Sequence, residues 1–326
     1  MIDWLTLKLD ASLLSPEVRN IFRQKQDMIL RLSPEGEKIW EIPARTAIRS
    51  DSHQVVARMG SDLEILGSPA RVMHSNNVFG SSNIIECFNA MREFICKELE
   101  IILPSKPEVW RLTRADITEN YLLDSLTEVK QALNYLRHAE GGRYQIRTTA
   151  ESVYWSPKSR LRSGKAYAKG PHLDYQLNKK QITITPEQLE IAQRILRLEL
   201  SLKSQFWRDR SLKPWYDYKD SELRQIHNDY FSQFIGHVEL AQNDDILDKL
   251  NSITTQGQAF AAYRTWKLIK SDGMESARSL MPKSSWYRHK KLLNKAGLSW
   301  ADFNNANIVK LEKRTILLNN PIEKWK

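Results

Sequence analysis

Tyr167 and Lys169 lie two residues apart, at the end of a predicted β-hairpin. Two short apolar and aromatic runs, Ser152–Trp155 and 165–168, flank a basic loop that contains Ser, Pro and Gly, a pattern typical of such hairpins. A spacing of two along a strand puts the phenol and the ammonium group on one face of a sheet. The cation lowers the cost of forming phenolate, so the pair suits attack on a phosphodiester. An ordinary cross-strand aromatic pair is the alternative interpretation of the same spacing.

The surroundings of this pair are strongly basic. Residues 141–180 contain 9 Lys or Arg and 2 Asp or Glu, a local excess of +7 (9 − 2). A field of this sign gathers a polyanion, and Arg160, Arg162 and Lys165 are candidate nucleic-acid contacts. Tyr154 and Tyr175 are close enough in the sequence to be rival nucleophiles.

Two further predicted strands each carry an acid two residues after an arginine. Arg114 and Asp116 share a face of one strand, and Arg197 and Glu199 share a face of the other. Carboxylates on neighbouring strands bind hard cations through oxygen, which makes Asp116 and Glu199 candidate ligands for Mg²⁺ or Mn²⁺. The two arginines are candidate phosphate contacts. Alternatively, each arginine pairs with the acid of its own strand on a solvated sheet, and the sequence leaves both interpretations open.

A polar loop supplies side chains that could line such a site. Residues 68–80 read S-P-A-R-V-M-H-S-N-N-V-F-G and include His74, Asn76 and Asn77. His172, followed by Leu and Asp, is the nearest approach to a histidine metal motif, although a single histidine in this setting is more often a hydrogen-bonded structural residue. The seven histidines of the chain are scattered, which argues against an imidazole-rich metal site.

The alternation of apolar and polar residues, together with the Pro and Gly residues between segments, predicts the strands and helices that position these residues. Strands are expected at 2–9, 38–42, 54–59, 62–66, 109–117, 152–155, 165–168 and 197–203, and helices at 83–102, 125–137 and 187–197. The expected fold is α+β, with a central antiparallel sheet and helices on one face, over residues 1–208.

Residues 209–326 are predicted to form a smaller, mainly helical and basic domain. From residue 261 onward the chain holds 14 Lys or Arg and 5 Asp or Glu, a net charge of +9 (14 − 5). Residues 273–297 show a helix, a tight turn and a basic helix, the helix-turn-helix pattern. The second helix would offer polar and basic groups to DNA: Lys283, Ser285, Tyr287, Arg288, Lys290 and Lys291. A basic helical hairpin with no role in the DNA groove is the alternative.

Composition excludes several classes of protein. A net charge of +10, with 41% hydrophobic and 27% charged residues, indicates a globular chain with an acidic partner such as nucleic acid. No apolar run is long enough to span a membrane, and the start is not typical of a signal peptide, so a cytoplasmic location is expected. Cys87 and Cys96 alone form neither a disulfide framework nor a zinc site. Walker A, G-x-G-x-x-G and G-x-S-x-G sequences are absent.

With these stretches in view, the chain resembles the replication initiation proteins of filamentous bacteriophages, the gene II protein family. The likeness lies in M-I-D-W-L-T-L-K-L, the 68–80 loop, T-R-A-D-I-T, Y-W-S-P-K-S-R-L-R-S-G-K-A-Y-A-K-G, R-L-E-L-S-L-K and M-P-K-S-S-W-Y-R, in that order. The tyrosine strand and the two arginine-acid strands also look like those of plasmid rolling-circle initiators.

This resemblance implies a rolling-circle nicking domain and a metal-dependent DNA nickase and strand transferase. The family's tyrosine nucleophile falls on Tyr167, which would form a 5′-phosphotyrosine and leave a 3′-OH. Lys169 would stabilise the phenolate or the phosphorane, and Asp116 and Glu199 would hold Mg²⁺ or Mn²⁺. The implied partners are double- and single-stranded origin DNA and the host replicative helicase and polymerase, in the bacterial cytoplasm, and the resemblance allows an oligomer on DNA. The chain lacks the His-hydrophobe-His metal motif of related nickases.

Two other classes compete with a nickase. A helix-turn-helix repressor or origin-bending protein would need only the basic C-terminal helices, with no tyrosine or carboxylate site. The other class is an RNA-processing or integrase-like tyrosine enzyme, and the integrase-like one would surround its tyrosine with arginines and histidines rather than carboxylates. A requirement for Mg²⁺ in nicking supercoiled origin DNA without ATP separates the nickase from both.

Overall fold

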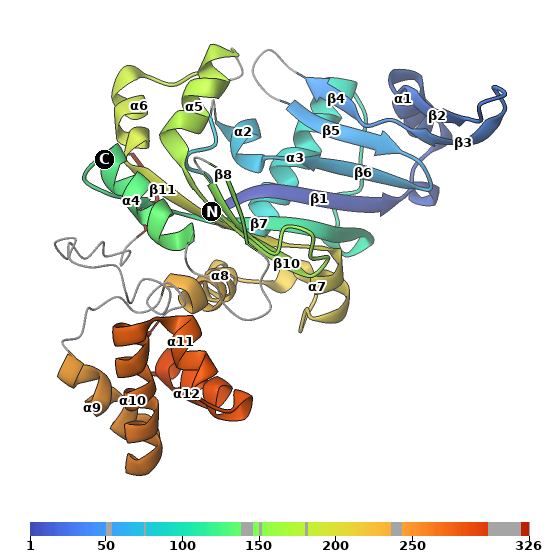
Figure 1. Ribbon diagram of the computed structural model, residues 1–326. Helices are drawn as coiled ribbons and strands as arrows, with labels where there is room; N and C mark the ends of the chain where they lie inside the picture. The colour runs from blue at the N-terminus through green and yellow to red at the C-terminus, as the bar shows by residue number, and fades with distance from the viewer. Residues whose placement is uncertain are drawn as a thin grey trace.

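The computed structural model describes residues 1–49, 54–74, 76–137, 146–149, 152–179, 182–235, 243–298 and 321–325. Within these residues the centre of the molecule is one nine-stranded antiparallel sheet, in the order β4-β5-β6-β1-β7-β11-β10-β9-β8 (Figure 1). Its strands are β1 Ile2–Asp10, β4 Thr46–Arg49, β5 Gln54–Met59, β6 Asp62–Gly67, β7 Trp110–Leu122, β8 Ile146–Thr149, β9 Ser152–Trp155, β10 Arg162–Ala168 and β11 Ile195–Leu202. The predicted α+β fold with a central antiparallel sheet is confirmed.

The helices fall into two groups along the chain. Those before residue 236 are α1 Pro16–Lys25, α2 Pro69–Met73, α3 Ile84–Leu99, α4 Leu126–Arg137, α5 Lys169–Asn178, α6 Pro186–Gln193, α7 Ser204–Asp209 and α8 Asp220–Ile235. Those after it are α9 Asn243–Ile253, α10 Gln256–Asp272, α11 Met274–Ser279 and α12 Lys283–Lys295. Short 3₁₀ turns occur at Ala11–Leu13, Pro107–Val109 and Trp215–Asp217. No helix in the described part of the chain is both long and apolar enough to cross a membrane.

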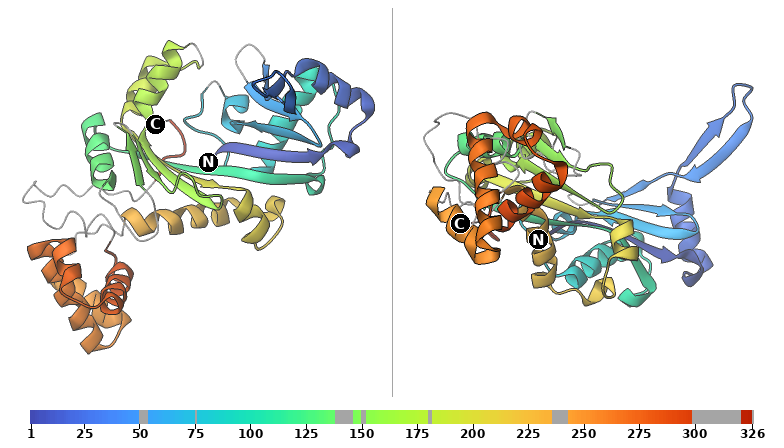
Figure 2. Two further views of the ribbon diagram at one scale, coloured as in Figure 1. Left: turned by 45° about the vertical axis from the view of Figure 1, so that its right-hand side comes forward. Right: turned by 60° about the horizontal axis from the view of Figure 1, so that its bottom comes forward.

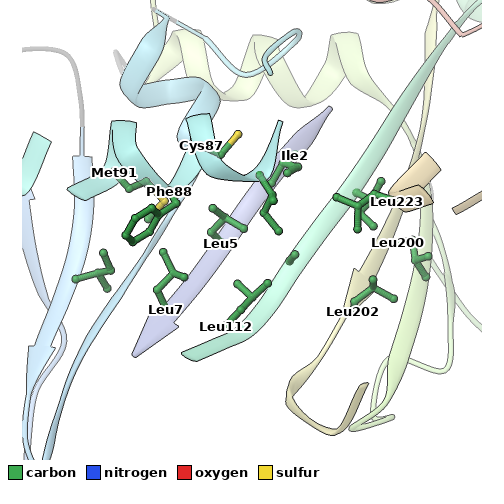
Figure 3. Close-up of a cluster of buried hydrophobic side chains, with 14 of the residues drawn as sticks. Ile2, Leu5, Leu7, Cys87, Phe88, Met91, Leu112, Leu200, Leu202 and Leu223 are labelled. Atoms are coloured by element: carbon green, nitrogen blue, oxygen red, sulfur yellow. The ribbon is translucent and has the colours of Figure 1, made fainter. Parts of the chain in front are cut away.

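The sheet has one apolar face and one polar face because its central strands alternate. In β11 the apolar residues Leu198, Leu200 and Leu202 are buried in the main core, while Arg197 and Glu199 point to the other side. Figure 3 shows Leu200 and Leu202 in one layer with side chains of β1, β7 and α3. The core is therefore on the apolar face, and the opposite face is left for polar side chains.

The apolar face is closed by helices. Buried side chains of α3, α4 and α8 belong to the same hydrophobic cluster as the strands, including Phe88, Leu133 and Phe234. The prediction that helices cover only one face of the sheet is wrong, because His172 of α5 packs edge-on against Tyr167 on the polar face.

The C-terminal helices have a hydrophobic core of their own. Buried residues of α9, α10, α11 and α12 form a separate cluster that includes Leu250, Trp266 and Leu293, and Figures 1 and 2 show these helices grouped apart from the sheet. A helical C-terminal part is thus present. α8 packs with the sheet rather than with this group, and the proposed division at residue 208 stays a prediction. Residues 299–320 of the predicted second domain lie outside the described residues.

Several predicted elements have different bounds in the structure. The helix expected at 187–197 ends at Gln193, and β11 begins at Ile195. The strand expected at 109–117 continues to Leu122, because its last residues keep alternating between the two faces and pair with β11. The strand expected at 38–42 is β3, Lys38–Pro43, which pairs with β2, Met28–Leu32, in a separate two-stranded ribbon.

Candidate active site

Tyr167 lies at the centre of the polar face, in a row across three strands. It is opposite Arg197 of β11, which in turn is opposite Asn120 of β7. The next row along contains Lys165, Glu199 and Thr118. Directly opposed residues of antiparallel strands share a face, so these six side chains converge.

The phenol of Tyr167 is enclosed by basic and aromatic groups. The residue is 4% exposed, the Nζ of Lys165 lies 3.9 Å from the ring centroid, and the His172 ring packs against it at 5.7 Å. Burial raises the pKa of the Tyr167 phenol well above its ordinary value, although the Arg197 guanidinium opposes the rise. Tyr167 is therefore protonated in this arrangement, and Lys165 is the cation packed against its ring.

Lys169 does not share the strand with Tyr167. β10 ends at Ala168 and Lys169 begins α5, so its predicted position on the strand face is wrong. The signal was present in the sequence, because Pro171 is tolerated in the first turn of a helix and disfavoured inside a sheet. The side chain is fully buried, and its Nζ donates to the Oδ1 of Asn77 at 2.9 Å.

Asn77 connects two buried charges. Its Nδ2 donates to the Oδ1 of Asp3 at 2.9 Å, while its carbonyl oxygen receives the Lys169 ammonium group. Burial, reinforced by the Arg197 charge, lowers the pKa of Lys169 well below its ordinary value. Burial alone would raise the pKa of Asp3, but Arg197, Lys169 and Asn77 together hold it below its ordinary value.

Arg197 links several elements on this face of the sheet. The side chain is fully buried, and its Nε donates to the Oδ1 of Asn120 at 2.8 Å. One Nη donates to the carbonyl oxygen of Val78 at 2.5 Å, and the other lies 3.6 Å from a carboxylate oxygen of Asp3. The guanidinium thus ties the 76–79 loop to three strands, and its burial excludes the predicted direct contact with DNA in this arrangement.

The two arginine-acid strands behave differently. Arg114 forms a bidentate ion pair with Asp116, with Nε–Oδ1 and Nη2–Oδ2 distances of 2.8 and 2.6 Å. Arg197 makes no such pair with Glu199. The expected pairing of arginine and acid within one strand is thus present in β7 and absent from β11.

Glu199 is a half-buried carboxylate. Within the described ranges its carboxylate has no hydrogen bond or ion pair. Burial, together with repulsion from Asp116 and Asp3, raises its pKa to about 7. Such mutual repulsion is what a bound cation would relieve. However, no group of three or more His, Cys, Asp or Glu side chains suited to a metal occurs in the described residues, and the oxygens of Asp116 are occupied by Arg114.

The remaining predicted site-lining residues divide into near and distant ones. His74 is exposed at the end of α2. Asn76 has a structural role, since it accepts from the backbone N–H of Val78 and donates to the Thr183 carbonyl oxygen at 3.4 Å. His172 lies at the site, and burial lowers its pKa to about 4, with Lys169 contributing.

The predicted DNA contacts of the hairpin differ in exposure and in the face of the sheet on which they lie. Arg160 is exposed, whereas the guanidinium of Arg162 lies 5.2 Å from the ring of Tyr230, on the apolar side of the sheet. The side chain of Arg114 is 41% exposed despite its ion pair. Of the rival tyrosines, Tyr154 is opposite Lys165 on the polar face and Tyr175 is exposed on α5.

In the C-terminal part, α12 presents most but not all of its predicted contacts. Lys283, Tyr287, Arg288 and Lys291 are exposed and Ser285 is partly so. Lys290 is buried, with its Nζ 5.6 Å from the Trp286 ring and its pKa lowered to about 7 by burial. The predicted outward position of Lys290 is wrong, because it falls on the side of α12 that packs against the other helices.

A family model and several relatives match this chain. A family model for the N-terminal part of the phage replication-associated protein, the gene II protein, matches residues 1–221. The chain is 22% identical over 292 residues to the replication-associated proteins of the same name from the Enterobacteria phages M13, f1 and fd, covering 75% of this chain and 71% of each relative. Among solved structures, it is similar to a rolling circle replication initiator protein from Geobacillus stearothermophilus, with 11% identity and a TM-score of 0.29, over 91% of this chain and 96% of that one.

Proposed function

Because the chain belongs to the family of the phage replication-associated gene II protein, we propose that it initiates rolling-circle replication by nicking one strand of origin DNA with Tyr167. The observation that carries this proposal is the phenol packed against Lys165 and opposite Arg197, one row from Glu199, on the polar face of the sheet. A repressor has no use for such a constellation.

The proposed reaction is a transesterification. The Tyr167 oxygen loses its proton to water and attacks the phosphorus atom, the P–O3′ bond breaks, and the leaving 3′ oxygen takes up a proton from water, which leaves a 5′-phosphotyrosine and a free 3′-OH. After one round of synthesis, a 3′-OH attacks the tyrosyl phosphate and releases the tyrosine. The number of phosphoester bonds is unchanged, so neither step needs ATP.

The roles follow from the positions of the charges. Lys165 is the cation closest to the ring and would compensate a phenolate. Arg197, Asn77 and Lys169 would hold the site rigid from within the sheet, so Lys169 acts as a positioning residue rather than as a partner of the phenolate.

A divalent cation, Mg²⁺ or Mn²⁺, is part of the proposal. Glu199, whose carboxylate repels Asp116 and Asp3, fits an oxygen ligand for a hard cation. Asp116 would be a second ligand only by sharing its oxygens with Arg114. A bound cation would polarise the scissile phosphate.

The exposed basic side of α12 is the proposed surface for duplex origin DNA, where Lys283, Arg288 and Lys291 would contact phosphates. Whether α11 and α12 act as a helix-turn-helix is part of the same proposal. Origin DNA, the host helicase and polymerase, an oligomer on DNA and the bacterial cytoplasm follow from the family resemblance and are proposed with it.

A covalent-adduct assay tests the proposed reaction. Wild type, incubated with labelled origin DNA and Mg²⁺, should form a protein–DNA adduct, and Tyr167→Phe should bind the DNA and form none. Tyr154→Phe and Tyr175→Phe are matched controls that should keep adduct formation. An adduct in Tyr167→Phe would transfer the role to one of those tyrosines. The absence of any wild-type adduct on single-stranded or supercoiled origin DNA would favour the repressor.

A further inference from the structure

The β2–β3 ribbon is the largest exposed apolar feature of the described chain. Its side chains are between 41% and 54% exposed: Met28, Ile29, Leu30, Leu32, Ile39, Trp40 and Ile42. The right-hand view of Figure 2 shows the ribbon extending away from the main sheet. Seven large apolar side chains in one short segment exceed the scattered exposure that is normal for a soluble surface.

Both faces of the ribbon are apolar. Ile29 is opposite Ile42, and both lie on one face; Met28 and Leu30 lie on the other, opposite Pro43 and Glu41. An ordinary surface hairpin covers one face with its own protein and gives polar residues to the other. Among the residues that the structure describes, nothing covers either face, and such a pattern is typical of a surface that contacts another molecule.

The edges of the ribbon are open as well. β2 and β3 pair with each other and form a sheet separate from the nine-stranded one. Each strand therefore has an outer row of backbone N–H and C=O groups available to another strand. Natural surfaces usually protect such edges, and leaving two of them on an apolar ribbon indicates a β-strand partner.

The charge of the ribbon argues against DNA as that partner. Residues 28–43 contain three acids and two bases, a net charge of −1 (2 − 3), in a chain whose net charge is +10. Phosphate contacts need Lys and Arg. The ribbon is thus poorly suited to a polyanion and well suited to an apolar protein surface.

We propose that the ribbon is a dimerisation arm and that its occupant is the ribbon of a second copy of this chain. Two identical ribbons can meet around a two-fold axis, where one open edge of each ribbon pairs and the apolar faces join into one larger sheet. The seven side chains expose about 600 Å² of apolar area per copy on the two faces together, and pairing at one edge covers part of it, so the contact is smaller than the roughly 800 Å² per partner of a standard interface and the dimer is a weak one. This inference concerns assembly and does not rest on the nicking chemistry.

The test compares the full-length protein with an arm variant by sedimentation at several micromolar concentrations. Ile29→Thr/Leu30→Thr/Ile42→Thr removes apolar surface and keeps residues that favour β-strands. Wild type should be a dimer without DNA, and the dissociation constant of the variant dimer should be about 100-fold higher. Leu212→Thr is the matched control, because Leu212 is 96% exposed outside the ribbon, and it should leave the dimer intact.

Disulfide trapping locates the interface directly. Leu30→Cys in a Cys96→Ser background should form a covalent dimer on oxidation, whereas Leu212→Cys in that background should not. A wild type that stays monomeric at all concentrations would overturn the proposal. So would an arm variant that dimerises like wild type, or one whose single defect is weaker DNA binding.

Discussion

Glu199→Gln should stabilise the protein at about pH 8 and leave its stability almost unchanged at about pH 4. Burial and the charges of Asp116 and Asp3 raise the pKa of the Glu199 carboxyl from its ordinary 4.5 to about 7. The folded chain therefore binds this proton more tightly than the unfolded chain does. Stability from this group is fully present below the ordinary pKa and is lost as the pH rises through about 7.

The size of the effect follows from that difference. A tenfold change in proton affinity is worth about 1.4 kcal/mol, so a pKa rise from 4.5 to about 7 corresponds to an upper limit of about 3 kcal/mol. The side chain is half-buried, and contact with water screens part of the repulsion. We therefore expect a gain of about 2 kcal/mol for the neutral glutamine at alkaline pH.

Urea unfolding with a chelator present measures this gain at both pH values. Glu222→Gln is the control of opposite sign, because a hydrogen bond from Lys213 lowers the pKa of Glu222. That variant should lose stability above the ordinary carboxyl pKa rather than gain it. Parallel stability profiles for wild type and Glu199→Gln across the pH range would refute the reasoning. If Glu199 is a metal ligand, added Mg²⁺ should restore the stability that wild type loses at alkaline pH.

Asn77→Ala removes the amide that accepts from Lys169 and donates to Asp3. Two buried hydrogen bonds to charged groups are lost, so the free energy of unfolding should fall by about 3 kcal/mol in urea unfolding, and an unchanged midpoint would contradict the buried network. Gly170→Ala would place a Cβ 2.5 Å from the Cα of Gln193, so α5 and α6 must separate. We expect a loss of about 2 kcal/mol by the same measurement, and wild-type stability would contradict the close packing of these helices.

Local alternation was enough to predict much of the sheet. β11 is a clear case, since Leu198, Leu200 and Leu202 alternate with Arg197 and Glu199, and the structure separates the two sets on opposite faces. Such a pattern shows on which face of the sheet each residue lies, but it does not show the order of the strands. The sequence therefore could not show which side chains of different strands become neighbours.

The contacts made by Arg197 illustrate what the sequence could not show, namely its partners on another strand and in a distant loop. Its partners are Asn120 on the adjacent strand and the carbonyl oxygen of Val78 in a loop far away in the sequence. Asp3, which faces the same guanidinium, was not identified as a site residue. A carboxylate between Ile2 and Trp4 in a predicted strand was the available signal, because such a group is buried only with a cation or hydrogen-bond donors beside it.

On the polar face, the buried charged groups have a structural role, and the proposed chemistry belongs to other side chains. Asp3, Asn77, Lys169 and Arg197 contact one another inside the protein, so their net effect is to hold the loop and the strands in place. A phosphodiester can reach the phenol of Tyr167 only if the groups packed on its ring move aside. Lys165 is the one with the freedom to do so, because a flexible lysine side chain can turn from the ring to a phosphate. In the proposed reaction, DNA would withdraw the cation from the ring face and bring a negative charge toward it, so DNA binding would also expose the proposed nucleophile.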